Sequence, residues 1–221
     1  MSTAALKAVI FDMDGVLIDS EPTWQIAEHT VLTELGLNVS MEDMALTTGL
    51  RIDQVVAFWY SRSPWDNYDN QQTAQAIVER VVSHITTHGE PMTGVIKALQ
   101  ACQERGLRVG LATSSSSDII NAVLNRLQIA EYFHAIKSAE HLAYGKPHPE
   151  VYLSCAQALN IDPIYCLAIE DSFNGLVSAR AANMQTIAIP EAKDAALSKW
   201  AIAHHRLDNL AELAEFLAKH S

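Results

Sequence analysis

The feature that most constrains the fold is a series of short apolar runs, each too short for a helix and separated by segments with helical spacing. The apolar runs cover 7–11, 107–112, 135–136, 166–169 and 185–189, with 204–205 in a final strand or turn, and helical segments cover 93–105, 117–127, 150–159, 172–182 and 209–219. Such short runs are typical of buried strands. Strands that alternate with helices form a parallel sheet covered on both faces. The sequence therefore predicts an α/β fold with a doubly wound parallel sheet.

Residues 20–90 interrupt this alternation, because no strand-like run lies among them. Helical spacing covers 23–35, 52–61 and 73–88, and a capping-box pattern stands at 40–43. A chain of 221 residues fits one large domain with a smaller insertion. We expect a core made of 1–19 and 91–221, with a small α-helical domain, 20–90, inserted after the first strand.

Composition limits the partners that this chain can bind. It has 26 acidic and 15 basic residues, a net charge of −11, which argues against nucleic-acid binding because phosphates require a basic face. A locally positive site can still bind a small anion. No run approaches the roughly 18 apolar residues of a membrane helix, and no signal peptide stands at the start. We expect a soluble cytoplasmic protein, a monomer, with no nucleic-acid or membrane partner.

Two carboxylates follow the first predicted strand. Asp12 and Asp14 are separated by one residue and followed by Gly15. At the carboxyl edge of a parallel sheet they would point into the usual ligand crevice. A calcium-binding EF-hand is excluded, because glycine stands fourth rather than sixth and Thr23 occupies the twelfth position. Alone, such a pair is more typical of a solvated turn, so its interpretation depends on the residues at the other strand ends.

Three further polar groups stand at strand ends or in a loop beside a helix start. Thr113 and Ser114 follow the second strand, Lys146 lies in a proline-flanked loop, and Glu170 and Asp171 follow the fourth strand. Each alone has a simpler explanation, such as a helix cap or an exposed loop lysine. Together with the first acid pair they supply a nucleophile, a hydroxyl, a cation and metal-binding acids, which are the parts of a phosphoryl-transfer site.

The order of these motifs resembles the haloacid dehalogenase superfamily. Along the chain they are DxDGVxxDS (12–20), TS (113–114), GKPxPExY (145–152) and EDSxxG (170–175). Over essentially the whole length the chain resembles the β-phosphoglucomutase-like group of sugar-phosphate phosphatases, and 49–60 is similar to the hexitol phosphatases of that group. The resemblance implies a Rossmann-like core with a helical cap domain. It also implies Mg²⁺-dependent hydrolysis of small sugar phosphates, such as hexose or hexitol phosphates and 2-deoxyglucose 6-phosphate.

The resemblance assigns roles to the acids. Asp12 is the expected nucleophile, which forms an aspartyl-phosphate. Asp14 is the expected general acid for the leaving alcohol and then the base for water. Metal ligands are expected from Asp12, Asp171 and the backbone carbonyl of Asp14. Glu170 is expected either to bind the metal directly or to lie just outside its ligands.

The remaining assignments concern the phosphate and the alcohol. Thr113 and the backbone N–H of Ser114 are expected to hold the phosphoryl oxygens, and Lys146 to neutralise charge there and pair with the nucleophile. In the insertion, Trp24 lies just past the hinge and is a candidate for contact with substrate. Arg51, a rare cation in this part of the chain, is the candidate for binding sugar hydroxyls.

Three other enzyme activities and one non-enzymatic role can be weighed against hydrolysis of a phosphate ester. A dehalogenase needs no second acid such as Asp14, and a phosphonatase needs a cap lysine, whereas no lysine lies between Lys7 and Lys97. A phosphomutase of the β-phosphoglucomutase type carries a histidine four residues after the position of Ser20, where this chain has Trp24, and a cap lysine for its second phosphate. These departures favour water as the acceptor. A catalytically silent binding protein remains the alternative outside enzymes.

Overall fold

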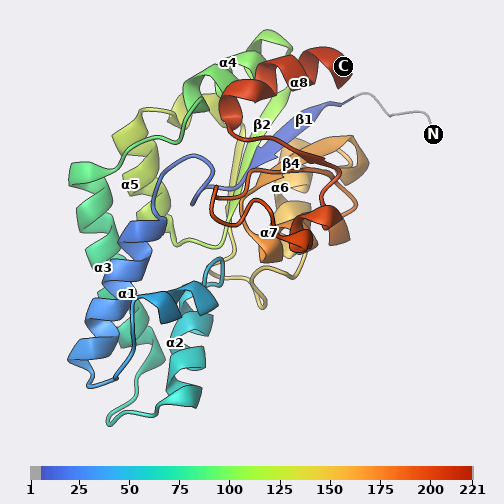
Figure 1. Cartoon of the computed structure of the whole chain (residues 1–221). Helices are drawn as coiled ribbons and strands as arrows, with labels where there is room; N and C mark the ends of the chain where they lie inside the picture. Colours follow the sequence, from blue (N-terminus) through green and yellow to red (C-terminus); the bar gives the residue numbers. More distant parts are fainter. Residues whose placement is uncertain (1–5, 221) are drawn as a thin grey trace.

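The computed structural model describes residues 6–220 and has a parallel six-stranded sheet at its centre (Figure 1). The strands are β1 (Ala8–Phe11), β2 (Arg108–Thr113), β3 (Ala135–Ser138), β4 (Cys166–Glu170), β5 (Gln185–Ala188) and β6 (His205–Arg206). Their order is β3-β2-β1-β4-β5-β6, and every adjacent pair is parallel. The sheet extends to both sides of β1, with β2 and β3 on one side and β4, β5 and β6 on the other. The predicted doubly wound sheet is therefore confirmed.

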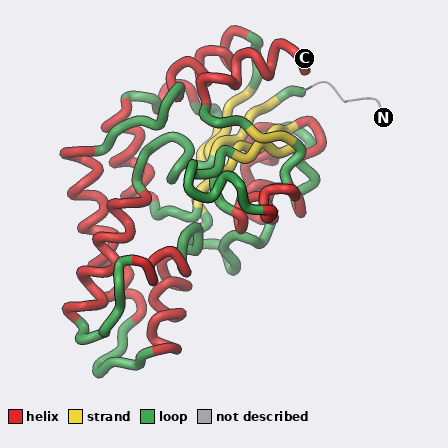
Figure 2. Tube along the Cα trace, in the orientation of Figure 1, coloured by secondary structure: helices red, strands yellow, loops and turns green. Residues whose placement is uncertain are grey.

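Five helices cover the two faces of the sheet (Figure 2). They are α4 (Val95–Glu104), α5 (Ser117–Leu127), α6 (Glu150–Leu159), α7 (Phe173–Ala181) and α8 (Leu213–His220). Alternation along β1 explains the two layers: Val9 and Phe11 pack with α4, α5 and α8, whereas Ala8 and Ile10 pack with α6 and α7. Because β1 is apolar on both faces, it lies in the middle of the sheet.

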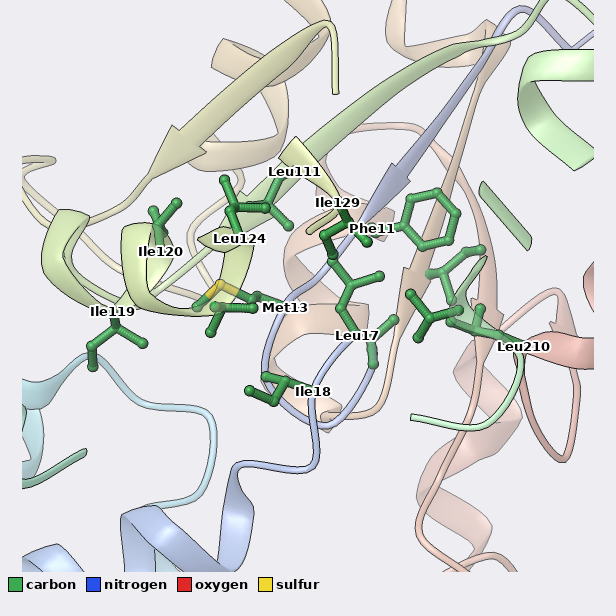
Figure 3. Close-up of a cluster of buried hydrophobic side chains, with 14 of the residues drawn as sticks. Phe11, Met13, Leu17, Ile18, Leu111, Ile119, Ile120, Leu124, Ile129 and Leu210 are labelled. Carbon is green, nitrogen blue, oxygen red and sulfur yellow. The ribbon is translucent and has the colours of Figure 1, made fainter. Parts of the chain in front are cut away.

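The loop after β1 is anchored by its apolar side chains. Met13, Leu17 and Ile18 are fully buried and pack with side chains of β2 and α5 (Figure 3). Asp12 and Asp14 flank the buried Met13, so the core fixes the loop while both acids remain at the carboxyl edge of the sheet. The core packing thereby positions the first acid pair.

The helices of residues 20–90 stand beside the sheet and have a small apolar core of their own (Figure 1). They are α1 (Glu21–Glu34), the short 3₁₀ helix η1 (Glu42–Leu46), α2 (Ile52–Arg62) and α3 (Asn70–His88). Leu32, Met44, Val55 and Trp59, from α1, η1 and α2, are buried together, whereas α3 packs into the larger core cluster. We call this segment the cap.

The two connections between cap and core lie side by side. The amide of Asp19 donates to the carbonyl of Glu90 at 3.1 Å, and the amide of Met92 donates to that of Leu17 at 3.1 Å. This pairing falls next to the predicted boundaries at 19/20 and 90/91. The boundaries themselves stay a prediction. None of the helices between residues 6 and 220 has the length and apolar character needed to cross a membrane.

Candidate active site

The carboxyl ends of three strands and one loop bring polar side chains to the same point. Asp12 follows β1, Thr113 ends β2, and Glu170 ends β4. Lys146, from the loop between β3 and α6, places its Nζ atom 2.8 Å from Asp12 Oδ1 and 2.6 Å from Glu170 Oε1. The lysine is only 2% exposed. The four segments singled out in the sequence therefore meet at one edge of the sheet.

Glu170 is buried, and both of its carboxylate oxygens accept hydrogen bonds. Its Oε1 accepts from Lys146 Nζ and from the hydroxyl of Tyr152, each at 2.6 Å, and its Oε2 accepts from Ser172 Oγ at 3.0 Å. A Cβ atom at Gly175 would lie 1.9 Å from Oε1, so only glycine fits there. This arrangement holds the ammonium of Lys146 against Asp12. Tyr152 is the last residue of the lysine motif, and nothing in the sequence indicated this contact.

Three carboxyl groups form an all-oxygen set that can hold a cation. Ligand atoms of Asp12, Glu170 and Asp171 lie within 4.8 Å of one another. Among the described residues, Asp12 Oδ1 is buried and accepts no hydrogen bond of good geometry, although the Lys146 ammonium is close. The loop after β1 passes so close to Asp171 that a Cβ atom added at Gly15 would lie 2.0 Å from Asp171 Oδ2. Oxygen donors of this kind suit Mg²⁺.

The charges of this cluster also favour a bound cation. Burial and the neighbouring Glu170 raise the pKa of Asp12, whereas Lys146 lowers it. Burial and the Asp12 carboxylate raise the pKa of Asp171 well above its usual range. One lysine thus faces three carboxyl groups. A divalent cation would favour their ionised forms, so the residues present fit Mg²⁺.

Asp14 is held by three side-chain donors. Its Oδ1 accepts hydrogen bonds from Ser20 Oγ at 2.6 Å and from Trp24 Nε1 at 2.9 Å, and its Oδ2 accepts from Ser115 Oγ at 2.6 Å. These donors come from both cap and core, so they fix the orientation of the carboxylate. The structure therefore places Trp24 against the expected general acid. Ser115 was missed, because nothing in the run of four serines distinguishes it.

The loop after β2 places hydroxyl groups at the same edge. Thr113 is buried, and its Oγ1 accepts a hydrogen bond from the amide of Ser115 at 3.0 Å. The hydroxyl oxygens of Ser114 and Ser116 are buried and have no hydrogen-bond partner among residues 6–220. Unpaired buried hydroxyls carry a free-energy cost that a bound oxyanion can remove. The sequence pointed to the amide of Ser114 but not to these side chains.

A pocket lies between core and cap. Its core wall comprises Asp12, Asp14, Thr113, Ser114, Ser115, Ser116, Lys146 and Ser172. Its cap wall comprises Glu21, Trp24, Gln25, Glu28, Met44, Thr47, Thr48, Gly49, Leu50, Ile52 and Val55. The core thus supplies the phosphoryl-transfer groups, and the cap supplies mixed polar and apolar groups on the opposite side.

Arg51 lies outside this lining. Its Nε and Nη2 atoms pair with the Asp53 carboxylate at 2.5 and 2.8 Å, and its Nη1 donates to the carbonyls of Ala139 at 2.8 Å and Leu142 at 2.6 Å. The guanidinium is therefore occupied by a neighbouring acid and by the core loop that leads to Lys146. Arg51 therefore joins cap and core, and its expected contact with sugar hydroxyls stays a prediction.

A family model of the haloacid dehalogenase-like hydrolases matches residues 9–189. The chain belongs to this family. Hexitol phosphatase B of Escherichia coli O157:H7 is 42% identical over 209 residues, which is 94% of each chain. Fructose-1-phosphate phosphatase YqaB of Escherichia coli K12 is 33% identical over 181 residues, 81% of this chain and 94% of that protein. The predicted family and the predicted enzyme class, a phosphatase, are confirmed.

Solved structures of haloacid dehalogenase-like proteins share the same fold. CbbY from Rhodobacter sphaeroides, in complex with phosphate, superposes with a TM-score of 0.83 at 25% identity, covering 94% of this chain and 96% of that one. The β-phosphoglucomutase of Clostridium difficile gives a TM-score of 0.83 at 24% identity, covering 97% and 96%. These likenesses agree with the predicted α/β fold.

Proposed function

We propose that this chain is a Mg²⁺-dependent phosphatase that hydrolyses small sugar phosphates, such as hexose or hexitol phosphates, through an aspartyl-phosphate on Asp12. The observation that carries the proposal is the buried Lys146 ammonium between Asp12 and Glu170, beside Asp14, at the base of a pocket closed by the cap. The 42% identity to a hexitol phosphatase and the 33% identity to a fructose-1-phosphate phosphatase support the sugar class.

In the first step, a carboxylate oxygen of Asp12 forms a bond to phosphorus while the bond from phosphorus to the alcohol oxygen breaks. Lys146 offsets the charge of the transferring group, and the hydroxyls of Thr113 and Ser114 stand where its oxygens would bind. Asp14 gives its proton to the leaving oxygen, which departs as an alcohol. The donors around Asp14 keep it oriented toward that oxygen.

In the second step, Asp14 takes a proton from water as the water oxygen attacks the phosphorus of the aspartyl-phosphate. The bond to Asp12 breaks, and inorganic phosphate leaves. Mg²⁺ bound by Asp12, Asp171 and the backbone carbonyl of Asp14 would supply further neutralisation of the phosphoryl charge. Lys146 remains held by Glu170 throughout, so the nucleophile regains its partner after each turnover.

The cap wall of the pocket favours water over a second phosphate as the acceptor. Its ionisable side chains are the carboxyls of Glu21 and Glu28. Trp24 occupies the position at which the family resemblance implies a histidine in a mutase. A second phosphate would meet no lysine or arginine on that wall. This absence, among the residues described, argues against a bisphosphate intermediate and so against mutase activity.

A panel of phosphorylated sugars with Mg²⁺, alongside p-nitrophenyl phosphate, tests the proposal. The wild type should release inorganic phosphate from sugar phosphates, and Asp12→Asn should lose turnover by at least about 10³-fold while remaining folded, because the amide keeps the shape but not the attacking oxyanion. An active Asp12→Asn variant would contradict the mechanism. A wild type that hydrolyses neither class of ester would favour the silent binding protein.

A further inference from the structure

The carboxyl group of Glu28 lies in the pocket, and the mechanism does not use it. Glu28 is 7% exposed and belongs to α1. Its Oε2 lies 3.1 Å from Thr47 Oγ1, which is also 3.0 Å from the carbonyl of Met44. No other hydrogen bond reaches this carboxyl group from residues 6–220, so Oε1 is left available. Oε1 is not sealed in the core but open to the pocket, so a hydroxyl of a bound substrate can reach it.

The position of Glu28 on α1 places it on the alcohol side of the pocket. Glu21, Trp24, Gln25 and Glu28 all line the pocket, at the spacing of one helix face. Trp24 donates to Asp14, which serves the leaving oxygen. Glu28 lies one turn farther along the helix, about 6 Å at 1.5 Å per residue. Its carboxyl group therefore stands beyond the leaving oxygen, where the carbon chain of the alcohol would extend.

We propose that Glu28 is a specificity-determining residue, whose carboxyl group hydrogen-bonds a hydroxyl of the sugar or polyol part of the substrate. This inference rests on the proposed phosphatase function and names the side chain that recognises the alcohol. Met44, Leu50 and Val55 form apolar parts of the same wall, so they limit the water that competes for this contact. A site built to bind a hydroxyl discriminates strongly against an analogue that lacks it.

The protonation state of Glu28 suits this role. Burial raises the pKa of Glu28 to about 8, with a smaller raising effect from Glu21 and a lowering one from the Thr47 hydroxyl. Across the pocket the titratable groups are Asp12, Asp14 and Lys146, and the cap loop 47–50 adds none. Near neutral pH the carboxyl group is therefore mainly protonated. It can donate to one hydroxyl and accept from another without adding negative charge near the phosphate.

The test compares Glu28→Met, Glu28→Gln and a control, Glu34→Met, which lies on the same helix outside the pocket lining. Each is assayed with the best sugar phosphate, with its monodeoxy analogues and with p-nitrophenyl phosphate. Glu28→Met should lower kcat/KM for the parent sugar phosphate about 10- to 100-fold relative to the aryl phosphate, which offers no hydroxyl. Glu28→Gln should keep most of the selectivity, and the control should keep all of it.

The deoxy series identifies the hydroxyl. For the one analogue that lacks it, wild type and Glu28→Met should give the same kcat/KM. Equal losses on every substrate, the aryl phosphate included, would make Glu28 a structural residue and overturn the proposal. Unchanged selectivity in Glu28→Met, with a wild type active on sugar phosphates, would overturn this proposal alone. A wild type without sugar phosphatase activity would overturn it together with the proposed function.

Discussion

Glu170 accepts hydrogen bonds from Lys146, Tyr152 and Ser172, whereas, within residues 6–220, Asp12 Oδ1 accepts none of good geometry and no side-chain donor bonds Asp171. Acids that are adjacent in sequence thus differ in what already surrounds them. An acid with both oxygens occupied is suited to hold a lysine, and one with a free oxygen is suited to bind metal or phosphorus. The sequence predicted Glu170 at or near the metal but could not separate these roles, because the hydroxyl that binds Glu170 belongs to Tyr152 on α6.

Glu28 should make the stability of the protein depend on pH. Its pKa is raised from a usual 4.5 to about 8, so the folded state keeps a proton that the unfolded chain releases. The contribution of this group is full below about pH 4.5 and is lost as the pH rises toward 8. The unfolding free energy of the wild type should therefore fall, relative to Glu28→Gln, by about 1.4 kcal/mol per pH unit between those values.

Urea denaturation of both proteins at several pH values between about 5 and 8 measures this slope. Glutamine keeps the size and the hydrogen-bonding capacity of the side chain but cannot titrate, so it is the matched control. Parallel curves for the two proteins would show that the Glu28 carboxyl group ionises at its ordinary pH.

At the scale of elements, apolar runs followed by a polar pair predicted which strand ends carry chemistry. The residues after β1, β2 and β4 do lie together, because the carboxyl ends of parallel strands share one edge, whereas their chemical roles stay a prediction. It could not find contacts between loops that are distant in sequence. Ser115 reaches Asp14 across 101 positions, and Arg51 reaches Ala139 across 88. Such partners depend on how the cap packs on the core, which no local pattern encodes.

Arg51→Ala should reduce kcat/KM for sugar phosphates and for p-nitrophenyl phosphate to a similar degree, about 10-fold or more. The change removes the hydrogen bonds from the start of α2 to the carbonyls of Ala139 and Leu142, just before Lys146. The cap would then close less often over either substrate. Steady-state kinetics on both substrates measure the effect, with Arg62→Ala at the exposed end of α2 as the control. A loss confined to sugar phosphates would instead return Arg51 to a direct contact with hydroxyls.

Over the whole molecule, the cap and core meet at the pocket, at the contacts of Arg51 with the loop before Lys146, between α3 and α5, and at the paired connections 17–19 and 90–92. The alternation of strands and helices was sufficient to predict the sheet and the insertion of helices after β1. The sequence could not show which cap side chains face the pocket, because the helical spacing of α1 gives its faces but not their orientation toward the core. Glu28 was missed for that reason, and the contacts of Arg51 with Ala139 and Leu142 were not foreseen.

Mg²⁺ should stabilise the whole fold, because it binds the folded acid cluster and not the unfolded chain. At 100 times its dissociation constant, a ligand adds about 2.7 kcal/mol to the unfolding free energy. The melting temperature should therefore rise on adding Mg²⁺ to chelator-treated protein, and phosphatase activity should return with it. In Asp171→Asn the rise should disappear. Since burial and Asp12 raise the pKa of Asp171, that variant should also melt higher than the wild type when both lack metal.

Asp118→Asn, at the exposed start of α5, is the control and should respond to Mg²⁺ as the wild type does. An equal Mg²⁺ response in Asp171→Asn, or full activity in excess chelator, would place the metal elsewhere or exclude it from the reaction.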